Sequence, residues 1–135
     1  MTVSCLRLRE KSFAFAVRIV KLVRFLEAER NERVLSRQVL RSGTSVGANV
    51  RESRFAQSTA DYVSKLSIAL KEADETGYWL ELLHETKLIT DEQFESLNVD
   101  LNWLTGTLVN IVKASKRKLS TKHMSAANLC NLCNT

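Results

Sequence analysis

The sequence predicts an all-α protein, an antiparallel up-down-up-down four-helix bundle. Proline is absent, only four glycines occur in 135 residues, and long segments repeat apolar residues at helical intervals. Folds rich in strands or loops need many turn residues, whereas long helices with short connections do not. A chain of this length has room for one core. We therefore expect one bundle domain at residues 7–118 and a flexible polar C-terminal tail at 119–135.

The first helix is expected at residues 11–29, where two adjoining apolar stripes cover about half of the helix circumference. These stripes consist of Phe15, Ile19, Leu22 and Leu26, and of Phe13, Ala16, Val20 and Val23. The opposite side, with its lead-in, carries the basic residues Arg7, Lys11, Arg18, Lys21 and Arg24. The expected third helix carries a second apolar stripe with Trp79. Together these stripes are more apolar surface than one four-helix core readily buries, so they predict a subunit interface as well.

The net charge of +5 has its origin in this first segment. Residues 7–24 contain six basic residues and one acidic residue, whereas basic and acidic residues balance over the rest of the chain. A helix face that is merely solvated usually mixes both signs. Because nucleic acid attracts such a stripe through its phosphates, the five basic residues are candidates for nucleic-acid binding. No aromatic residue lies between them, so stacking on bases is not indicated.

The second helix is expected at residues 34–57, although its centre is rich in glycine, serine and threonine. Either a loop interrupts the segment, or the small side chains let a neighbouring backbone approach closely. We favour a continuous helix, because Val39, Val46 and Val50 keep helical spacing through this stretch. Each glycine would cost about 1 kcal/mol relative to alanine, which packing must offset.

The third helix is expected to start at a cap on Ser58 or Thr59 and to continue to residue 85. Residues 90–93, Thr-Asp-Glu-Gln, are a strong start signal for the fourth helix. Its predicted core stripe then alternates steps of three and four, as in a bundle seam. The stripe consists of Phe94, Leu97, Leu101, Leu104, Leu108 and Ile111. Lys113, Lys116, Arg117 and Lys118 close this helix, where positive charge suits the C-terminal end of the helix dipole.

A polar network between the second and third helices is a further expectation. Glu72 and Glu75 lie three residues apart on an otherwise apolar face, and buried charges require partners. The residues expected to form the network are Arg41, Ser45, Asn49, Glu52, Glu72 and Glu75. We interpret this network as structural, setting helix register or a subunit contact. Its alternative is a catalytic pair of carboxylates.

No other pattern points to catalysis, a metal or a cofactor, so we expect a protein that is not an enzyme. Cys130 and Cys133 form a lone CxxC motif, and a zinc site needs four ligands. His84 has no second histidine at ligand spacing, and no phosphate-binding loop is present. Three cysteines do not make a disulfide framework, and neither a transmembrane segment nor a secretory signal is apparent. A cytoplasmic protein is the expectation.

Two blocks in the expected second and third helices resemble a known family. RSGTSVGANVRE at residues 41–52 and ALKEADETGYWL at 69–80 strongly resemble the bacterial four-helix-bundle proteins named after 23S rRNA intervening sequences. The resemblance spans residues 11–118. The C-terminal cysteine motif departs from the family pattern, so the resemblance implies no role for it.

The resemblance implies a fold and, less directly, a function. Members of this family form up-down bundles that assemble into ring-shaped homopentamers, so a homo-oligomer is implied here. We hypothesise that the oligomer binds RNA or a ribonucleoprotein through the basic face of the first helix. A related branch, the accessory variability determinants of diversity-generating retroelements, implies the alternative. In that case the protein would be an adaptor that binds a reverse transcriptase and its template RNA.

Overall fold

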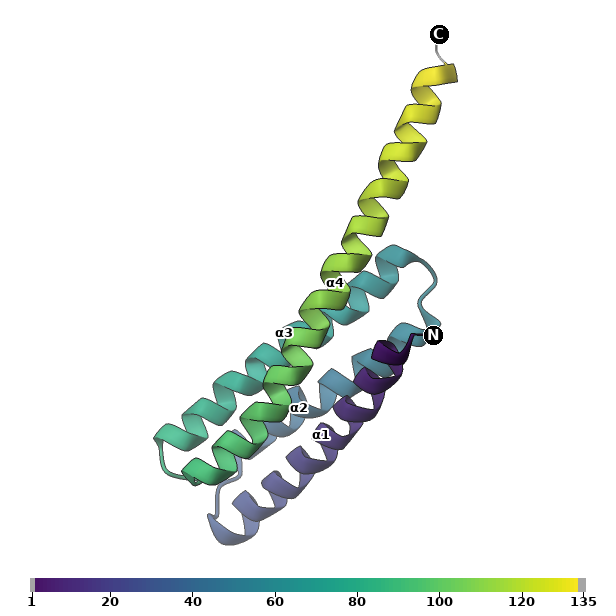
Figure 1. Ribbon diagram of the computed structural model, residues 1–135. Coiled ribbons are helices and arrows are strands. Elements are labelled where there is room, and N and C mark those ends of the chain that lie inside the picture. Colours follow the sequence, from purple (N-terminus) through teal and green to yellow (C-terminus); the bar gives the residue numbers. More distant parts are fainter. Residues whose placement is uncertain (1, 134–135) are drawn as a thin grey trace.

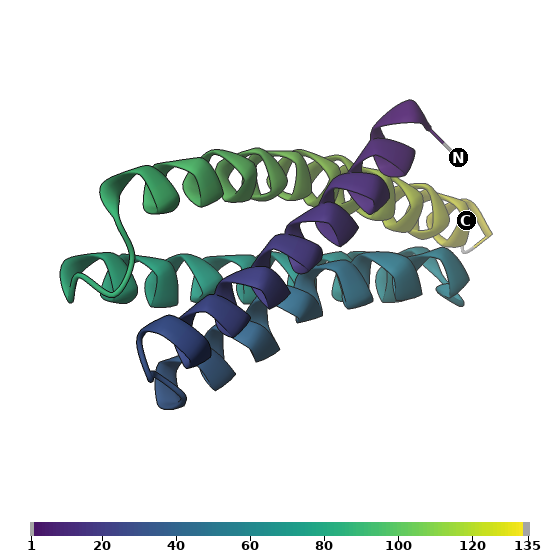
Figure 2. The ribbon, with the colours of Figure 1, turned by 90° about the horizontal axis from the view of Figure 1, so that it is seen from below.

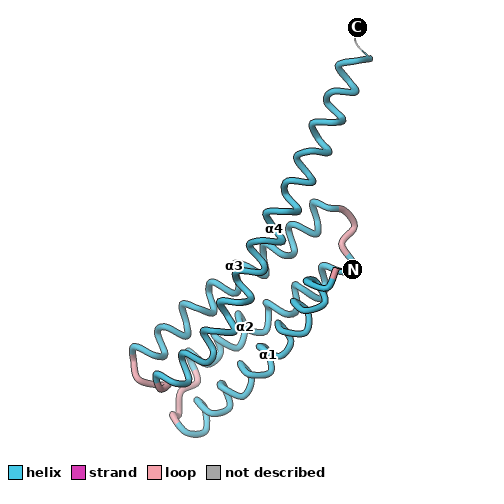
Figure 3. The backbone as a smooth tube through the Cα atoms, viewed as in Figure 1, coloured by secondary structure: helices cyan, strands magenta, loops and turns pink. Residues whose placement is uncertain are grey.

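The computed structural model describes the backbone of residues 2–133 and the side chains of residues 2–125. This range contains four long helices and no strand: α1 (Val3–Glu29), α2 (Val34–Glu52), α3 (Thr59–Glu85) and α4 (Asp91–Cys133). The predicted all-α class with four helices is confirmed. The α1–α2 and α3–α4 connections lie at one end of the molecule, and the α2–α3 connection lies at the other end beside the N-terminus (Figure 1, Figure 3).

α1 begins at Val3, earlier than the predicted start at residue 11. The Thr2 hydroxyl caps the helix by accepting a hydrogen bond from the Cys5 backbone N–H at 3.3 Å. Leu8 and Ser12 are buried and continue the predicted core stripe by two positions toward the N-terminus. The first helix therefore contributes its N-terminal two turns to the core as well.

α2 starts immediately after a connection in which Asn31 adopts a left-handed φ of 55°. The Glu32 carboxylate accepts hydrogen bonds from the backbone N–H groups of Val34, Leu35 and Ser36 at 2.9–3.2 Å. It thereby satisfies donors that have no partner within the helix. Partial burial raises the pKa of the Glu32 carboxyl, but these hydrogen bonds outweigh that effect and lower the pKa overall.

The glycine-rich centre of α2 is continuous helix, as predicted. A Cβ atom on Gly43 would lie 2.8 Å from Cγ1 of Ile19, and one on Gly47 would lie 3.2 Å from the carbonyl oxygen of Ser12. Both glycines therefore let α1 approach closely, which confirms the second of the two alternatives. The helix ends at Glu52 instead of residue 57, and a short 3-10 helix, η1 (Ser53–Phe55), follows it.

Side-chain caps set the starts of α3 and α4 at their predicted positions. The Ser58 hydroxyl accepts from the Asp61 N–H at 3.0 Å. At α4, the Gln93 N–H donates to the Thr90 hydroxyl at 3.1 Å, and the Thr90 N–H donates to the Gln93 side chain at 2.9 Å. This reciprocal pair is a capping box with Gln at its third position, and it confirms the start signal in residues 90–93.

The core lies between helices that are consecutive in the chain, and α1 also touches α4. The α1–α4 contact is the smallest of these contacts between the long helices, and Figure 2 shows α1 running obliquely to α3 and α4. Most of the predicted core positions on α4 are buried, namely Leu97, Leu101, Leu104 and Leu108. α3 buries Leu66, Ala69, Ala73, Leu80 and Leu83 against the same core. None of the described helices combines the length and apolar character needed to cross a bilayer.

α4 continues as a helix to Cys133, beyond its predicted end near Lys118. Val112 is its last buried residue among the described side chains. In Figure 1, α4 extends well past the other three helices. The helical state of 119–133 corrects the sequence interpretation, while the flexibility expected of 119–135 stays a prediction.

Candidate nucleic-acid interface

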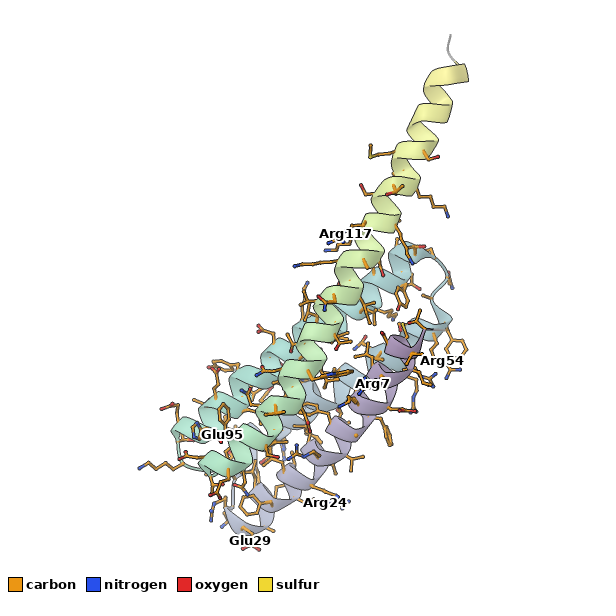
Figure 4. All side chains as sticks on the ribbon, in the orientation of Figure 1. Arg7, Arg24, Glu29, Arg54, Glu95 and Arg117 are labelled. Atoms are coloured by element: carbon orange, nitrogen blue, oxygen red, sulfur yellow. The ribbon has the colours of Figure 1, made fainter. Side chains whose placement is uncertain are left out.

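The five basic residues predicted on the first helix all lie on α1, but their surroundings differ. Arg7, Lys11, Lys21 and Arg24 are exposed, and Arg18 is half-buried. At about 100° per residue, one side of the helix carries Arg7, Lys11, Arg18 and Lys21. Arg24 lies roughly 100° around the helix from Arg7. Figure 4 shows Arg7 and Arg24 toward opposite ends of α1.

Arg18 is neutralised within the chain. One terminal nitrogen of its guanidinium lies 2.7 Å from Oδ2 of Asp100 and 3.1 Å from the Ser96 carbonyl oxygen. The other terminal nitrogen donates to the Ser96 hydroxyl at 2.7 Å. These three bonds use the planar fork of the guanidinium to tie α1 to α4. We therefore leave Arg18 out of the surface that is free to meet a ligand.

Lys11 is held beside an aromatic ring of α4 and remains accessible. Its ammonium group lies 4.7 Å from the centroid of the Trp103 ring. A contact of this kind attracts the cation without cancelling its charge. No local pattern in the sequence pairs Lys11 with Trp103, because the side of α4 that meets α1 depends on how the helices cross.

The remaining cations on this side, Arg7 and Lys21, form no ion pair with any described side chain. Lys21 lines a groove of about 270 Å³ between α1 and α4, together with Arg18 and Gln93. Arg24 is likewise exposed and forms no ion pair with a described side chain, but it lies farther around the helix from Arg7 and Lys11, so we centre the candidate surface on Arg7, Lys11 and Lys21. We call these three residues the α1 cationic face.

Three of the six residues predicted for the polar network meet at Arg41. One terminal nitrogen of Arg41 donates to Oε2 of Glu72 at 3.1 Å, and the other forms an ion pair with Glu75. Arg41 and Glu75 are substantially exposed, and an ion pair in such a setting contributes about 1 kcal/mol or less. The arrangement links α2 to α3, which is the structural interpretation made from the sequence.

The other three predicted members do not join this cluster. The Ser45 hydroxyl donates to the Arg41 carbonyl at 2.6 Å, and the Asn49 amide donates to the Ser45 carbonyl at 2.8 Å. Both bonds stay within α2. Glu52 pairs instead with Lys65 of α3, at 3.1 Å.

A buried polar contact between α2 and α3 was missed from the sequence. The hydroxyl oxygens of Ser42 and Thr76 lie 2.9 Å apart, and both residues are fully buried. Ser42 lies three residues after Val39 and four before Val46, which places it on the buried side of α2. This spacing was the available signal, because a serine at a core position needs a hydrogen-bonding partner.

A second hollow, of about 600 Å³, lies between α1 and α2 on the far side of α1 from Lys11. Apolar Leu6 and Phe13 line it and are 48% and 57% exposed. Small residues of α2, including Gly47 and Ala48, form its floor, and charged side chains such as Arg51 surround it. We call this hollow the α1/α2 groove.

The described side chains include no group of three His, Cys, Asp or Glu residues that could hold a metal ion. His84 lies 2.6 Å from Asp91 and stacks on Phe94, with ring centroids 4.3 Å apart, so it joins the ends of α3 and α4. Cys5 lies 3.6 Å from the Tyr62 hydroxyl. Burial and this contact raise the pKa of Tyr62 to about 12. The side chains of Cys130 and Cys133 lie outside the described residues.

Comparisons with known proteins agree with this architecture. The family of the 23S rRNA-intervening sequence protein matches residues 5–110. A similar solved structure is that of a protein of unknown function from the S23 ribosomal protein family of Bacteroides thetaiotaomicron VPI-5482. It shares 54% sequence identity with a TM-score of 0.81, covering 82% of this chain and 99% of that chain. No curated protein matches the chain. The chain therefore belongs to the 23S rRNA-intervening sequence protein family.

Proposed function

We propose that this protein is a cytoplasmic, non-enzymatic, homo-oligomeric antiparallel bundle that binds RNA or a ribonucleoprotein through the α1 cationic face. The observation that carries the proposal is the state of Arg7, Lys11 and Lys21. All three are exposed, and none forms an ion pair with a described side chain. The family name and the ribosomal family of the solved relative support RNA as the polyanion.

The mechanism follows from simple electrostatics. Exposed cations along about half of α1 attract a phosphate backbone and displace the counterions condensed on it. Phosphate contacts fix the position of a nucleic acid but carry no sequence information directly. Trp103 lies beneath the ammonium of Lys11 and is only partly exposed, so the face offers charge and little surface for base stacking. Binding through this face is therefore sensitive to salt and tolerant of sequence.

Removing two charges from the α1 cationic face is expected to weaken RNA binding and its dependence on salt. The variant combines Arg7→Gln with Lys21→Gln, and the probe is a fluorescein-labelled RNA hairpin followed by anisotropy between about 50 and 200 mM salt. Each lost phosphate contact should reduce the slope of log K against log salt by about 0.7 to 0.9. The expected reduction is therefore about 1.5.

The matched control combines Arg37→Gln with Lys71→Gln. Both residues are exposed, lie on α2 and α3, and make no ion pair with a described side chain. This variant has the same total charge as the α1 variant, so it separates a local surface from a general charge effect. Equal slopes for the two variants would rule out the α1 cationic face as the binding surface.

The homo-oligomer part of the proposal rests on the α1/α2 groove. Leu6, Phe13 and Val17 expose apolar surface along one side of α1, and an exposed patch of this kind is typical of an interface. At about 100° per residue, Phe13 lies about 160° around α1 from Lys11 and about 120° from Arg7, so a second copy could cover the groove while leaving these two cations in water. Lys21, four residues after Val17, lies beside the apolar patch. The resemblance to ring-forming bundles supports a second copy of this chain as the partner.

Light scattering after size-exclusion chromatography is expected to give a mass of at least two chains, each of 15.3 kDa. Phe13→Asp should lower this mass, because a charge would then be buried without a partner in the interface. Val99→Asp, at an exposed position of α4, is the control and should leave the mass unchanged. A wild-type protein with the mass of one chain would disprove self-association.

A further inference from the structure

α4 carries a second, separate concentration of positive charge. Asp100 is the last acidic residue in the sequence. Five basic residues follow it, all of them exposed: Lys113, Lys116, Arg117, Lys118 and Lys122. None of the five forms an ion pair with a side chain in the described range. We call residues 113–125 the α4 arm.

The helix dipole does not account for this charge in the structure. A favourable interaction between cations and the dipole is confined to the last turn of a helix. α4 continues to Cys133 and has no basic residue in its last turn. Lys118 therefore lies several turns before the end of the helix. An interaction with the C-terminal end of the helix dipole, expected from the sequence, therefore does not explain these basic residues.

The arm is also unfavourable for the helix that contains it. Lys113 and Arg117 are four residues apart, as are Lys118 and Lys122, and like charges at this spacing repel each other on a helix surface. Tertiary packing adds little, because no described side chain after Val112 is buried. A helix of this kind gains stability when a polyanion neutralises its charges.

The arm begins after the residues that the family model matches. The family match ends at residue 110, and the solved relative covers 82% of this chain while nearly all of its own length is matched. Figure 1 shows α4 extending past the bundle, and Figure 4 places Arg117 on this extending section. The arm thus follows the residues that the family model matches and lies on a different helix from the α1 cationic face.

We infer that the α4 arm is a second phosphate-binding surface, which contacts the backbone of helical RNA. The inference rests on the proposed function, since it names a further contact for the same ligand class. Lys116 and Arg117 lie three and four residues after Lys113. The three side chains therefore share one side of the helix and can meet consecutive phosphates. Because the arm has no Phe, Tyr or Trp side chain, its contacts are mainly to phosphates and not to bases.

An anionic membrane is a poorer fit for the arm. A helix that lies in a membrane surface buries a continuous apolar face, typically with Trp, Phe and Leu. From 113 to 125 the only apolar side chains are Ala114, Leu119 and Met124. Lys118 and Lys122 interrupt the side of the helix opposite Lys113. The charges alone fit a polyanion that stays in water.

The test uses the full chain with the substitutions Lys116→Gln and Arg117→Gln. Its reference is the control variant of equal charge, with Arg37→Gln and Lys71→Gln. RNA hairpin binding is measured by anisotropy across the same range of salt, and circular dichroism checks that the helix content is retained. We expect the slope of log K against log salt to fall by about 1.5 relative to wild type, at about 0.7 to 0.9 per lost contact. The control should keep the wild-type slope.

The outcomes separate this inference from the proposed function. If the α1 variant lowers the slope and the α4 variant behaves like the control, the arm is not a binding surface and the proposed function stands. If only the α4 variant lowers the slope, the arm is the binding surface and the α1 face is not. Binding to phosphatidylserine vesicles that depends on Lys116 and Arg117, without binding to the hairpin, would overturn the RNA assignment in favour of a membrane.

Discussion

Leu8→Ala is expected to lower the free energy of unfolding by about 3 kcal/mol. Leu8 is 2% exposed and lines a cavity of about 180 Å³ with Val50 and Leu66. Removing its side chain loses apolar burial and enlarges a hollow that the surrounding helices cannot close, which costs about 2–5 kcal/mol for leucine. Urea denaturation followed by circular dichroism, at one protein concentration for all variants, measures this loss.

Val3→Ala is the control for this experiment, because Val3 lies on the same end of α1 and is 80% exposed. A substitution on the surface should change stability by no more than about 0.5 kcal/mol. If the first helix began at residue 11, as the sequence suggested, Leu8 would lie in a lead-in segment and both variants would behave alike. A small effect of Leu8→Ala would therefore contradict the early start of α1.

Gly43→Ala and Gly106→Ala are expected to change stability in opposite directions. The added Cβ at Gly43 would lie 2.8 and 2.9 Å from two side-chain carbons of Ile19, and Ile19 is fully buried. Those carbons branch next to the α1 backbone, so α1 itself would have to move. Overpacking of this kind costs about 1–3 kcal/mol, and we expect a loss of about 2 kcal/mol in the free energy of unfolding.

Gly106 offers the matched control, since nothing lies within 4 Å of the Cβ that alanine would add there. Alanine should then stabilise α4 by about 0.5–1 kcal/mol, through the smaller loss of backbone entropy on folding. Urea denaturation of the two variants gives both values. Stabilisation by both substitutions would show that α1 does not pack closely against the centre of α2.

Much of the fold could be predicted from the sequence because each helix carries its own local signals. The capping box at Thr90 and Gln93 and the cap at Ser58 are read from neighbouring residues, and the structure has both. The close approach of α1 to α2 was predictable because valines keep helical spacing around Gly43 and Gly47. Where one residue determines the conformation of the next few residues, the local structure can be predicted from the sequence.

The two ends of the bundle were harder to predict. Basic residues surround Leu8 and hide the continuation of the core stripe toward the N-terminus. At the other end, residues after Lys118 show no sustained apolar periodicity, so the pattern used to recognise packed helices does not apply to them. Where a helix extends beyond the packed bundle it needs no apolar stripe. The end of such a helix therefore cannot be predicted from the apolar pattern.

The basic residues of the candidate interface could be predicted from the sequence, but which of them would stay without an ion pair could not. The excess of basic residues on α1 is a property of the sequence alone. That Arg18 meets Asp100 and that Lys11 lies beside Trp103 depends on the crossing of α1 and α4, which local patterns do not determine. The basic residues of the α4 arm were explained by the helix dipole because α4 was predicted to end near Lys118, before its actual end at Cys133.

The central claim is that positive charge on this bundle is left free to bind the phosphates of RNA. It is tested most directly by the salt dependence of RNA hairpin binding to the wild-type protein. With the three cations of the α1 cationic face and Lys113, Lys116 and Arg117 of the α4 arm all engaged, the slope of log K against log salt should be about −4 or steeper. A slope near zero, or no binding at about 50 mM salt, would contradict the claim.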